Sequence, residues 1–376
     1  MNVHLSPGAE AFRAEVAAFL ADYRGLDGYF HPSERWEDVC ALFRAMGDRG
    51  WLSLAWPESE GGLGLSLEHE YVLWDEAGYA RAARNPLSSG IVAKTLIRHG
   101  SPEQKRRWLP PIRAGELHFS LGYSEPEAGS DLASLRTRAE RRGDVYVVTG
   151  EKCWQSYGMD SDALWLLCRT GAPESRGEGL SLLVVDLAAP GVSVSPIPML
   201  DGHALAEVRL EGVEVPVADR VGPENGAWPI IGDALADERH IQFPPKRVRR
   251  DLEDLVGWVR AAGRSDDPAV GRRLADLGVL ALEVEIHALR VLDAIQKGRS
   301  GAVEAAASKV VHTEACQRIA DAALELGGPA ALVSDPGRVG AEQLWRQSRW
   351  ETIGGGTSEI MRGIVARQAL GLGARR

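Results

Sequence analysis

The sequence has little of what marks secreted, membrane or metal-binding proteins. Its 376 residues contain only four cysteines, Cys40, Cys153, Cys168 and Cys316, and none forms a C-x-x-C pair or has metal-ligand spacing with a histidine. This pattern predicts reduced thiols in a cytoplasmic protein that binds no metal. No apolar run approaches the ~20 residues that span a bilayer, and the chain does not open with a basic segment followed by an apolar one. We therefore expect neither a membrane span nor a secretion signal.

An excess of positive charge is also absent. The net charge is −10 and the pI is about 5.5, which argues against nucleic acid as the main partner. Two short basic runs, 105–107 and 246–250, are typical of solvated helix faces rather than of binding patches. A chain of this length buries a large core and usually forms two or three domains.

The spacing of apolar residues changes twice along the chain. Up to residue 115 it is helical, which predicts a helix starting at Ser6-Pro7 and others at 36–46, 66–84, 86–99 and 104–112, the last stopped by Pro110-Pro111. From about 116 the period is two, as in strands, and 213–216 is the expected last strand. From about 225 it is helical again, with one helix of roughly 28 residues and another at 309–326.

These changes predict an α+β fold in three parts. We expect an N-terminal helical domain (1–115), a middle antiparallel β domain (116–224) and a C-terminal four-helix-type bundle (225–376). Gly327-Gly328-Pro329 closes the second long helix of the bundle. Pro244-Pro245 falls where a continuous helix is otherwise expected, and prolines there cost about 3 kcal/mol unless the helix bends or ends.

The stretch that carries chemistry is 119–131, an apolar run that ends in a Gly- and Ser-rich turn. Gly129 allows a ligand to approach the backbone closely, and Ser124 and Ser130 offer hydroxyl groups beside free backbone N–H groups. Such a loop suits a phosphate or an electron-poor ring. By composition alone, the same residues are also typical of an ordinary Gly-Ser turn with no ligand.

The motif Tyr123-Ser124-Glu125-Pro126-x-Ala128-Gly129-Ser130-Asp131 resembles the first signature of the acyl-CoA dehydrogenase family. The resemblance covers nearly the whole chain, so it does not depend on one match. It continues in five further segments, 51–64, 100–116, 150–154, 222–228 and 356–362.

The resemblance implies FAD as cofactor and an acyl thioester as substrate. In this family a carboxylate takes the α-proton and the β-hydrogen leaves as hydride to the flavin. Carried over position by position, the residues expected at the flavin are Leu121, Tyr123, Ser124, Gly129, Ser130, Trp154, Ser156, Gly327, Gly328, Thr357 and Glu359. The last four come in this family often from a neighbouring subunit, and Ser130 is also expected to contact substrate.

The expected catalytic base is not at its usual place. Most family members have Tyr-Glu-Gly-Thr before the last signature, but here Gly355 occupies the position of that glutamate. A minority of members carry the base earlier, in a Leu-x-x-Glu-Arg context, and this chain has Leu235-Ala236-Asp237-Glu238-Arg239. The resemblance thus implies Glu238 as base and Arg239 as a substrate contact. The competing interpretation is a solvated Glu-Arg pair on a helix surface.

Contacts to a cofactor across a subunit interface are partly missing. The family's Arg-x-x-Phe-Gly segment is not recognisable near Arg264, and Leu324 replaces a glutamine. Three functions remain open at this point. They are an acyl-CoA dehydrogenase acting as a homotetramer or as a heterotetramer with a related chain, a flavin-dependent oxygenase, and a non-catalytic partner subunit. An electron-transfer flavoprotein is the expected electron acceptor of the first, and coenzyme A or an acyl carrier protein bears its substrate.

Overall fold

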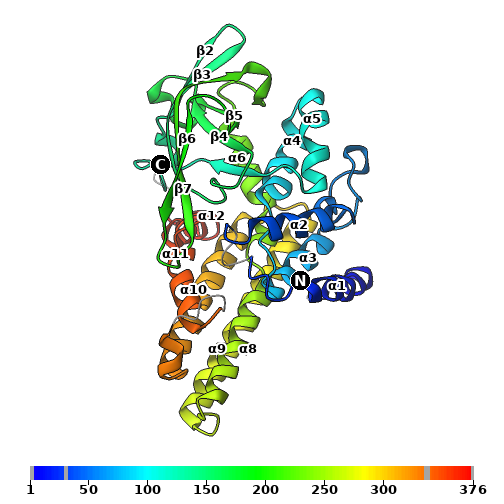
Figure 1. Ribbon diagram of the computed structural model, residues 1–376, viewed down its shortest axis with the longest axis vertical. Coiled ribbons are helices and arrows are strands. Elements are labelled where there is room, and N and C mark those ends of the chain that lie inside the picture. The colour runs from blue at the N-terminus through cyan, green and yellow to red at the C-terminus, as the bar shows by residue number, and fades with distance from the viewer. Residues whose placement is uncertain (1–3, 29–32, 334–338, 374–376) are drawn as a thin grey trace. The chain divides into compact units, whose positions relative to one another are not determined.

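The structure is a computed structural model that describes residues 4–28, 33–333 and 339–373 (Figure 1). Within these ranges the side chains of 235–237 and of Arg239 are not described. The chain forms two compact units. The first, which we call the helical unit, comprises 1–30, 67–84 and 239–376, and the second, the sheet unit, comprises 31–66 and 85–238.

Long helices make up the helical unit. In Figure 1 its α8, α9 and α10 lie alongside one another, and their apolar faces form one buried cluster that includes Leu255, Leu277 and Ile319. The helices are α1 (Pro7–Leu20), α3 (Leu67–Ala80), α7 (Arg239–Gln242), α8 (Pro245–Ala261), α9 (Pro268–Gln296), α10 (Ala302–Leu326), α11 (Ala341–Glu351) and α12 (Ser358–Gln368). Single 3₁₀ turns lie at Ala21–Tyr23 and Pro329–Leu332.

Local signals explain where several of these helices begin. The side chain of Ser6 accepts a hydrogen bond from the backbone N–H of Ala9, as predicted for the start of α1. Asp267 caps α9 in the same way, and α9 has 29 residues, close to the predicted length. The expected interruption at Pro244-Pro245 is confirmed, because α7 ends at Gln242 and α8 begins with Pro245 in its first turn.

The predicted start of α10 at Lys309 is wrong by about two turns. The helix begins at Ala302, after Gly301 in a left-handed conformation. Its first turns are rich in alanine and bury Ala305, Ala306 and Ser308. Small side chains give a weak hydrophobic period, although alanine has the highest intrinsic helix propensity.

The sheet unit combines an eight-stranded sheet with short helices. The strands are β1 (Phe119–Gly122), β2 (Arg138–Arg142), β3 (Val145–Gln155), β4 (Ala163–Arg169), β5 (Leu180–Asp186), β6 (Val192–Pro198), β7 (Ala204–Pro216) and β8 (Arg220–Val221). The helices are α2 (Trp36–Gly47), α4 (Ala93–His99), α5 (Pro102–Ala114) and α6 (Ala227–Asp237). Short helical turns lie at Trp51–Ser53, Glu58–Glu60, Ser88–Val92, Leu132–Ser134, Pro173–Gly179 and Val217–Asp219.

The strand order is β6-β7-β3-β2-β4-β5-β8, and β1 pairs with β4. The long ladders β3–β7, β6–β7 and β4–β5 are antiparallel, as predicted, whereas β1 runs parallel to β4. One face of the sheet packs with helical segments in a cluster that includes Trp108, Trp165 and Ile230. The cluster also includes Phe119 of β1 and Tyr123 and Ala128 of the loop at 123–131, so this loop is anchored in the core.

Three predicted boundaries in the sheet unit are wrong. Residues 213–216 end the long strand β7 and are not the last strand, because β8 follows. The segment 86–99 is not one regular helix, since a π-helical turn at Ser88–Val92 precedes α4. Helix α5 does not stop at Pro110-Pro111 but runs to Ala114.

The persistence of α5 has a simple cause. The N–H groups that the two prolines lack would have bonded to the carbonyls of Arg106 and Arg107. Both arginines are exposed, so water can satisfy those carbonyls. Buried Trp108 and Ile112 hold the turn to the core, and Gly115 ends the helix in a left-handed conformation.

Among the described residues, no helix is long and apolar enough to cross a membrane. No cluster of His, Cys, Asp and Glu within these ranges could hold a metal ion. All four cysteines are buried and free.

Candidate functional site

The loop that follows β1 is held from below by a buried ion pair. The carboxylate of Glu125 accepts hydrogen bonds from the backbone N–H groups of Arg136 (2.7 Å) and Thr137 (2.8 Å) and lies 2.9 Å from Nζ of Lys152. Burial opposes ionisation of Glu125, but Lys152 and the donated hydrogen bonds outweigh it and hold the pKa of the carboxyl below its ordinary value. Glu125 therefore fastens the loop to the backbone rather than facing a ligand.

Strand β3 supplies the second attachment of the loop. Lys152, which is 0% exposed, also donates a hydrogen bond to the backbone carbonyl of Tyr123 at 3.0 Å. The backbone N–H of Cys153 donates to the carbonyl of Ser124 at 3.1 Å. The two loop residues expected against the flavin are thus bound to the strand that carries Trp154.

The tip of the loop is open. Gly129 and Ser130 are exposed, and a Cβ added to Gly129 would meet no atom within 4 Å. Ser124 and Leu121 are half-buried at the base of the loop, and Tyr123 is buried. This arrangement leaves backbone and hydroxyl groups accessible at one end and side chains beside the core at the other. A phosphate-bearing aromatic ligand fits such a loop.

Trp154 is unusual in conformation and exposure. Its φ is +64°, in the left-handed region that bulky residues rarely adopt, and its side chain is 48% exposed. The pairing of β3 with β7 shifts between Lys152 and Gln155, so an irregularity in the strand turns Trp154 outward. Two residues later, the carbonyl of Ser156 accepts a hydrogen bond from Ser120 at 2.8 Å. An uncovered indole on a strained bulge is suited to stack on a planar ring.

Glu238 is buried in the sheet unit, at the C-terminal end of α6. Its side chain is 4% exposed, and Nδ2 of Asn85 donates a hydrogen bond to its Oε1 at 2.8 Å. Burial raises the pKa of the Tyr123 hydroxyl, and the negative charge of Glu238 raises it further, so this charge acts on the residue at the base of the loop. The alternative of a solvated surface pair is therefore wrong for Glu238. The side chain of Arg239 lies outside the described part of the chain.

The remaining predicted cofactor residues belong to the helical unit. Gly327 ends α10, and a Cβ there would lie 2.7 Å from both the Ala323 carbonyl oxygen and Ala331 Cβ, which already requires glycine. Gly328 has a φ of +72° with open space around it. Thr357 is the N-cap of α12, and its side chain accepts a hydrogen bond from the backbone N–H of Ile360.

Glu359 follows in the first turn of α12 and is exposed. A backbone hydrogen bond and the Thr357 hydroxyl hold its pKa below the ordinary value. An exposed, ionised carboxylate at this position is the opposite of a base whose pKa is raised by burial.

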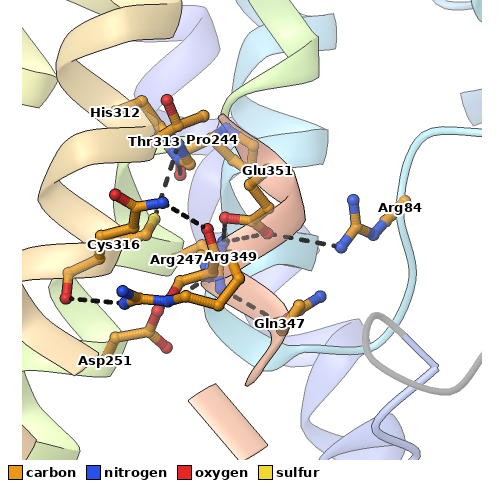
Figure 2. Close-up of polar contacts among 12 residues, drawn as sticks. Arg84, Pro244, Arg247, Asp251, His312, Thr313, Cys316, Gln347, Arg349 and Glu351 are labelled. Atoms are coloured by element: carbon orange, nitrogen blue, oxygen red, sulfur yellow. Dashed lines mark hydrogen bonds and ion pairs between the residues drawn. The ribbon is translucent and has the colours of Figure 1, made fainter. Parts of the chain in front are cut away.

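Glu351, which precedes Gly355 in the chain, is held in an ion pair. Nη1 of Arg247 donates to both of its oxygens at 2.8 and 2.9 Å, and Nε of Arg247 lies 2.8 Å from Oδ2 of Asp251 (Figure 2). Gln347 and Arg84 approach the same cluster. Because breaking a buried pair leaves an uncompensated charge, Glu351 is held as a structural carboxylate.

The structure thus divides the predicted site between the two units. The sheet unit carries Leu121, Tyr123, Ser124, Gly129, Ser130, Trp154, Ser156 and Glu238. The helical unit carries Arg239, Gly327, Gly328, Thr357 and Glu359. No motif in the sequence points to Asn85 or to the roles of Glu125 and Lys152. The latter two lie inside matched motifs, but only their burial identifies them as the attachment of the loop.

Comparison with known proteins matches most of the chain. Family models described as the N-terminal, middle and C-terminal domains of acyl-CoA dehydrogenase match residues 6–116, 120–213 and 228–370. "Acyl-CoA dehydrogenase FadE26" of Mycobacterium tuberculosis is 34% identical over 403 residues, covering 99% of this chain and 99% of the relative. A solved structure described as "Tcur3481-Tcur3483 steroid ACAD" has a TM-score of 0.92 at 34% identity, with 99% of each chain covered. The ChsE4-ChsE5 complex from Mycobacterium tuberculosis has a TM-score of 0.88 at 34% identity and covers 100% of both chains.

Proposed function

The chain belongs to the acyl-CoA dehydrogenase family, and on this premise we propose that it removes the α-proton of an acyl thioester with Glu238 while FAD receives the β-hydrogen. Membership in the family makes the protein an FAD-dependent oxidoreductase acting on CH–CH groups. The identity of the base, the other site residues and the substrate are parts of the proposal.

The residues present fit FAD. The open Gly129-Ser130 tip suits the pyrophosphate, while Trp154 with its uncovered indole and half-buried Ser124 suit the ring. When bound, FAD supplies the two-electron acceptor for the β-hydrogen. Leu121, Tyr123 and Ser156 complete the ring site in this proposal, and Gly327, Gly328, Thr357 and Glu359 contribute from a neighbouring subunit.

The observation that carries the proposal is the burial of Glu238 in a chain that has glycine at the usual position of the base. A general base needs surroundings that exclude water and move its pKa toward neutrality. Glu238 is 4% exposed, whereas Glu359 is exposed and Glu351 is bound by Arg247 through both oxygens. Glu238 is buried and accepts a hydrogen bond from the neutral amide of Asn85.

The chemistry assigned to this chain's residues is limited and specific. Glu238 accepts a proton at a carboxylate oxygen, which requires it to be ionised before substrate binds. Hydrogen bonds to the thioester carbonyl acidify the α-carbon, an effect worth several kcal/mol in other acyl-transfer and enolising enzymes. In this proposal Ser130 and Arg239 contact substrate.

A heteromeric assembly is the second part of the proposal. The Arg-x-x-Phe-Gly segment is not recognisable near Arg264, and Leu324 replaces a glutamine, so a neighbouring copy would offer an incomplete cofactor contact. One similar solved structure is described as a ChsE4-ChsE5 complex. We therefore propose that the protein assembles with a related chain, either as the catalytic member or as a subunit that completes its partner's site, and passes electrons to an electron-transfer flavoprotein.

Anaerobic titration of the purified flavoprotein with a panel of acyl-CoA and acyl carrier protein thioesters tests the catalytic part. The panel includes a steroid-bearing acyl-CoA, because one similar structure is described as a steroid ACAD. Bleaching of the flavin absorbance by a member of the panel supports dehydrogenation. No bleaching in the titration, together with oxygen consumption by reduced flavin in a separate aerobic assay, supports the oxygenase instead. FAD uptake only after a related chain is added supports the partner subunit.

The variant Glu238→Gln tests whether Glu238 acts as the base rather than supporting the fold. We expect the variant to keep its FAD and to lose flavin reduction by at least ~100-fold, which is the contribution typical of general base catalysis. Asp233→Asn, an exposed acid on α6, is the matched control and retains activity. Full activity in Glu238→Gln would place the base elsewhere.

A further inference from the structure

We propose that Asn85 is a positioning residue that orients the carboxylate of Glu238 and holds it in the ionised form, and that Gly90 is glycine because this pair needs the space. The inference rests on the proposed function, since it concerns the same base. It adds two residues that precede the base by about 150 positions and that no motif of the sequence identifies.

The contact itself is direct. Nδ2 of Asn85 donates to Oε1 of Glu238 at 2.8 Å, between residues 153 positions apart. The Oδ1 atom of Asn85 is buried and has no hydrogen-bond partner among the described residues. No described group therefore holds the acceptor end of the amide, while its donor end is bound to the carboxylate.

Backbone geometry limits the freedom of Asn85. The next residue is Pro86, and a residue before proline is largely confined to extended conformations. The amide thus projects from a restricted backbone, and orienting it loses less conformational freedom than it would in a flexible loop. This favours one orientation of the carboxylate that it binds.

Gly90 provides the space in which the pair meets. It lies in the π-helical turn Ser88–Val92, and a Cβ on Gly90 would stand 2.3 Å from Nδ2 of Asn85 and 2.7 Å from Oε1 of Glu238. Contacts this short force both polar groups to move. π-helical turns are uncommon and are frequently found at functional sites.

An amide suits both protonation states of a base. Its N–H group donates to the carboxylate, which favours the ionised form, and after proton transfer its carbonyl can accept the new O–H by rotation of the amide. The free Oδ1 of Asn85 provides that acceptor. Tyr123 is the titratable side chain of the sheet unit on which the Glu238 charge acts, and burial raises its pKa, so it stays protonated at neutral pH.

The test measures the rate of flavin reduction against pH in stopped-flow experiments. The rate rises with pH as the base ionises, which defines an acid limb. Asn85→Asp places a second carboxylate beside Glu238 at unchanged size, and Asn85→Leu removes the donor. We expect both variants to move the acid limb upward by ~1 pH unit or more, which is a ~10-fold loss of rate below the limb.

Two matched controls address folding. Thr95→Val removes a buried hydrogen bond to the Ile91 carbonyl in the neighbouring helix α4 and leaves the limb in place. Gly90→Ala moves the limb or abolishes reduction, whereas Gly232→Ala, on α6 with no atom within 4 Å of the new methyl group, changes neither. The FAD content and the flavin spectrum confirm that each variant is folded.

The outcomes separate this inference from the function beneath it. If Glu238→Gln is inactive but the acid limb of the pH profile is unchanged in both Asn85 variants, the positioning role of Asn85 is wrong and the proposed base stands. A Glu238→Gln variant that still reduces its flavin overturns the proposed base and this inference with it. A shifted limb in Asn85→Asp and Asn85→Leu, with Thr95→Val unchanged, supports the positioning role.

Discussion

Replacing Lys152 by methionine tests the attachment of the loop at 123–131 to strand β3. The change keeps the length of the side chain but removes the charge that lies 2.9 Å from Glu125 and the hydrogen bond of 3.0 Å to the Tyr123 carbonyl. Glu125 then stays buried with its negative charge uncompensated. Breaking a buried ion pair in this way costs about 3–5 kcal/mol.

The expected loss is large enough to measure by thermal unfolding. For a folding unit of roughly 150–250 residues, each kcal/mol moves Tm by about 2–4 °C, so Lys152→Met should lower Tm by about 6–20 °C. Tryptophan fluorescence reports unfolding, and the release of flavin reports the state of the loop. Because Tyr123 and Ser124 are bound to this strand, we expect flavin to leave at or before the unfolding midpoint.

Lys105→Met is the matched control for this experiment. Nζ of Lys105 lies 2.7 Å from Glu60 in the same unit, but both side chains are about a quarter exposed. Partly solvated pairs contribute about 0–1 kcal/mol, so the control should lose little. The double variant Glu125→Gln, Lys152→Met should recover part of the stability that Lys152→Met loses. Equal Tm values for Lys152→Met and Lys105→Met would refute the assignment of Glu125 and Lys152 as the attachment.

Two further predictions concern the helical unit. Burial, with a smaller contribution from Arg247, lowers the pKa of His312 to about 3. As the pH falls below about 6.5, the unfolded chain therefore binds a proton at His312 that the folded chain does not bind. Wild type should therefore lose about 2 kcal/mol more stability than His312→Gln between pH 6.5 and 5, and parallel urea-unfolding curves would contradict this. Gly355→Glu in the Glu238→Gln background should restore flavin reduction in the anaerobic titration, at a cost of about 1–2 kcal/mol, because the φ of +67° at 355 strains any residue with a Cβ. A double variant as inactive as Glu238→Gln would show that substrate does not present its α-carbon to position 355.

Much of the fold follows from local patterns. The order of helices, strands and helices, the cap of α1 and the length of α9 depend on periods and caps that lie within a few residues of one another. The predicted boundaries are wrong where tertiary contacts or small side chains override the local pattern. Helix α5 continues through two prolines because its buried residues hold the last turn in place, and α10 begins early on alanines that the hydrophobic period does not register.

The site shows the same division. The Ser-Glu-Pro and Ala-Gly-Ser-Asp turn and the absence of a carboxylate at 355 are readable from the residues alone. The structural role of Glu125 is not, because its donors, the backbone N–H groups of Arg136 and Thr137, belong to an irregular segment before β2 whose conformation the sequence does not reveal.

The sequence by itself determined the family resemblance, the three-part order of elements and the candidacy of Glu238, since each depends on residue types at short spacing. Only the tertiary structure decided that Glu238 is buried and that Asn85 and Gly90 lie beside it. The physical reason is that these neighbours are brought together by packing between a π-helical turn and the end of a distant helix. The residue pattern within either segment does not predict which side chains of the other segment will contact it.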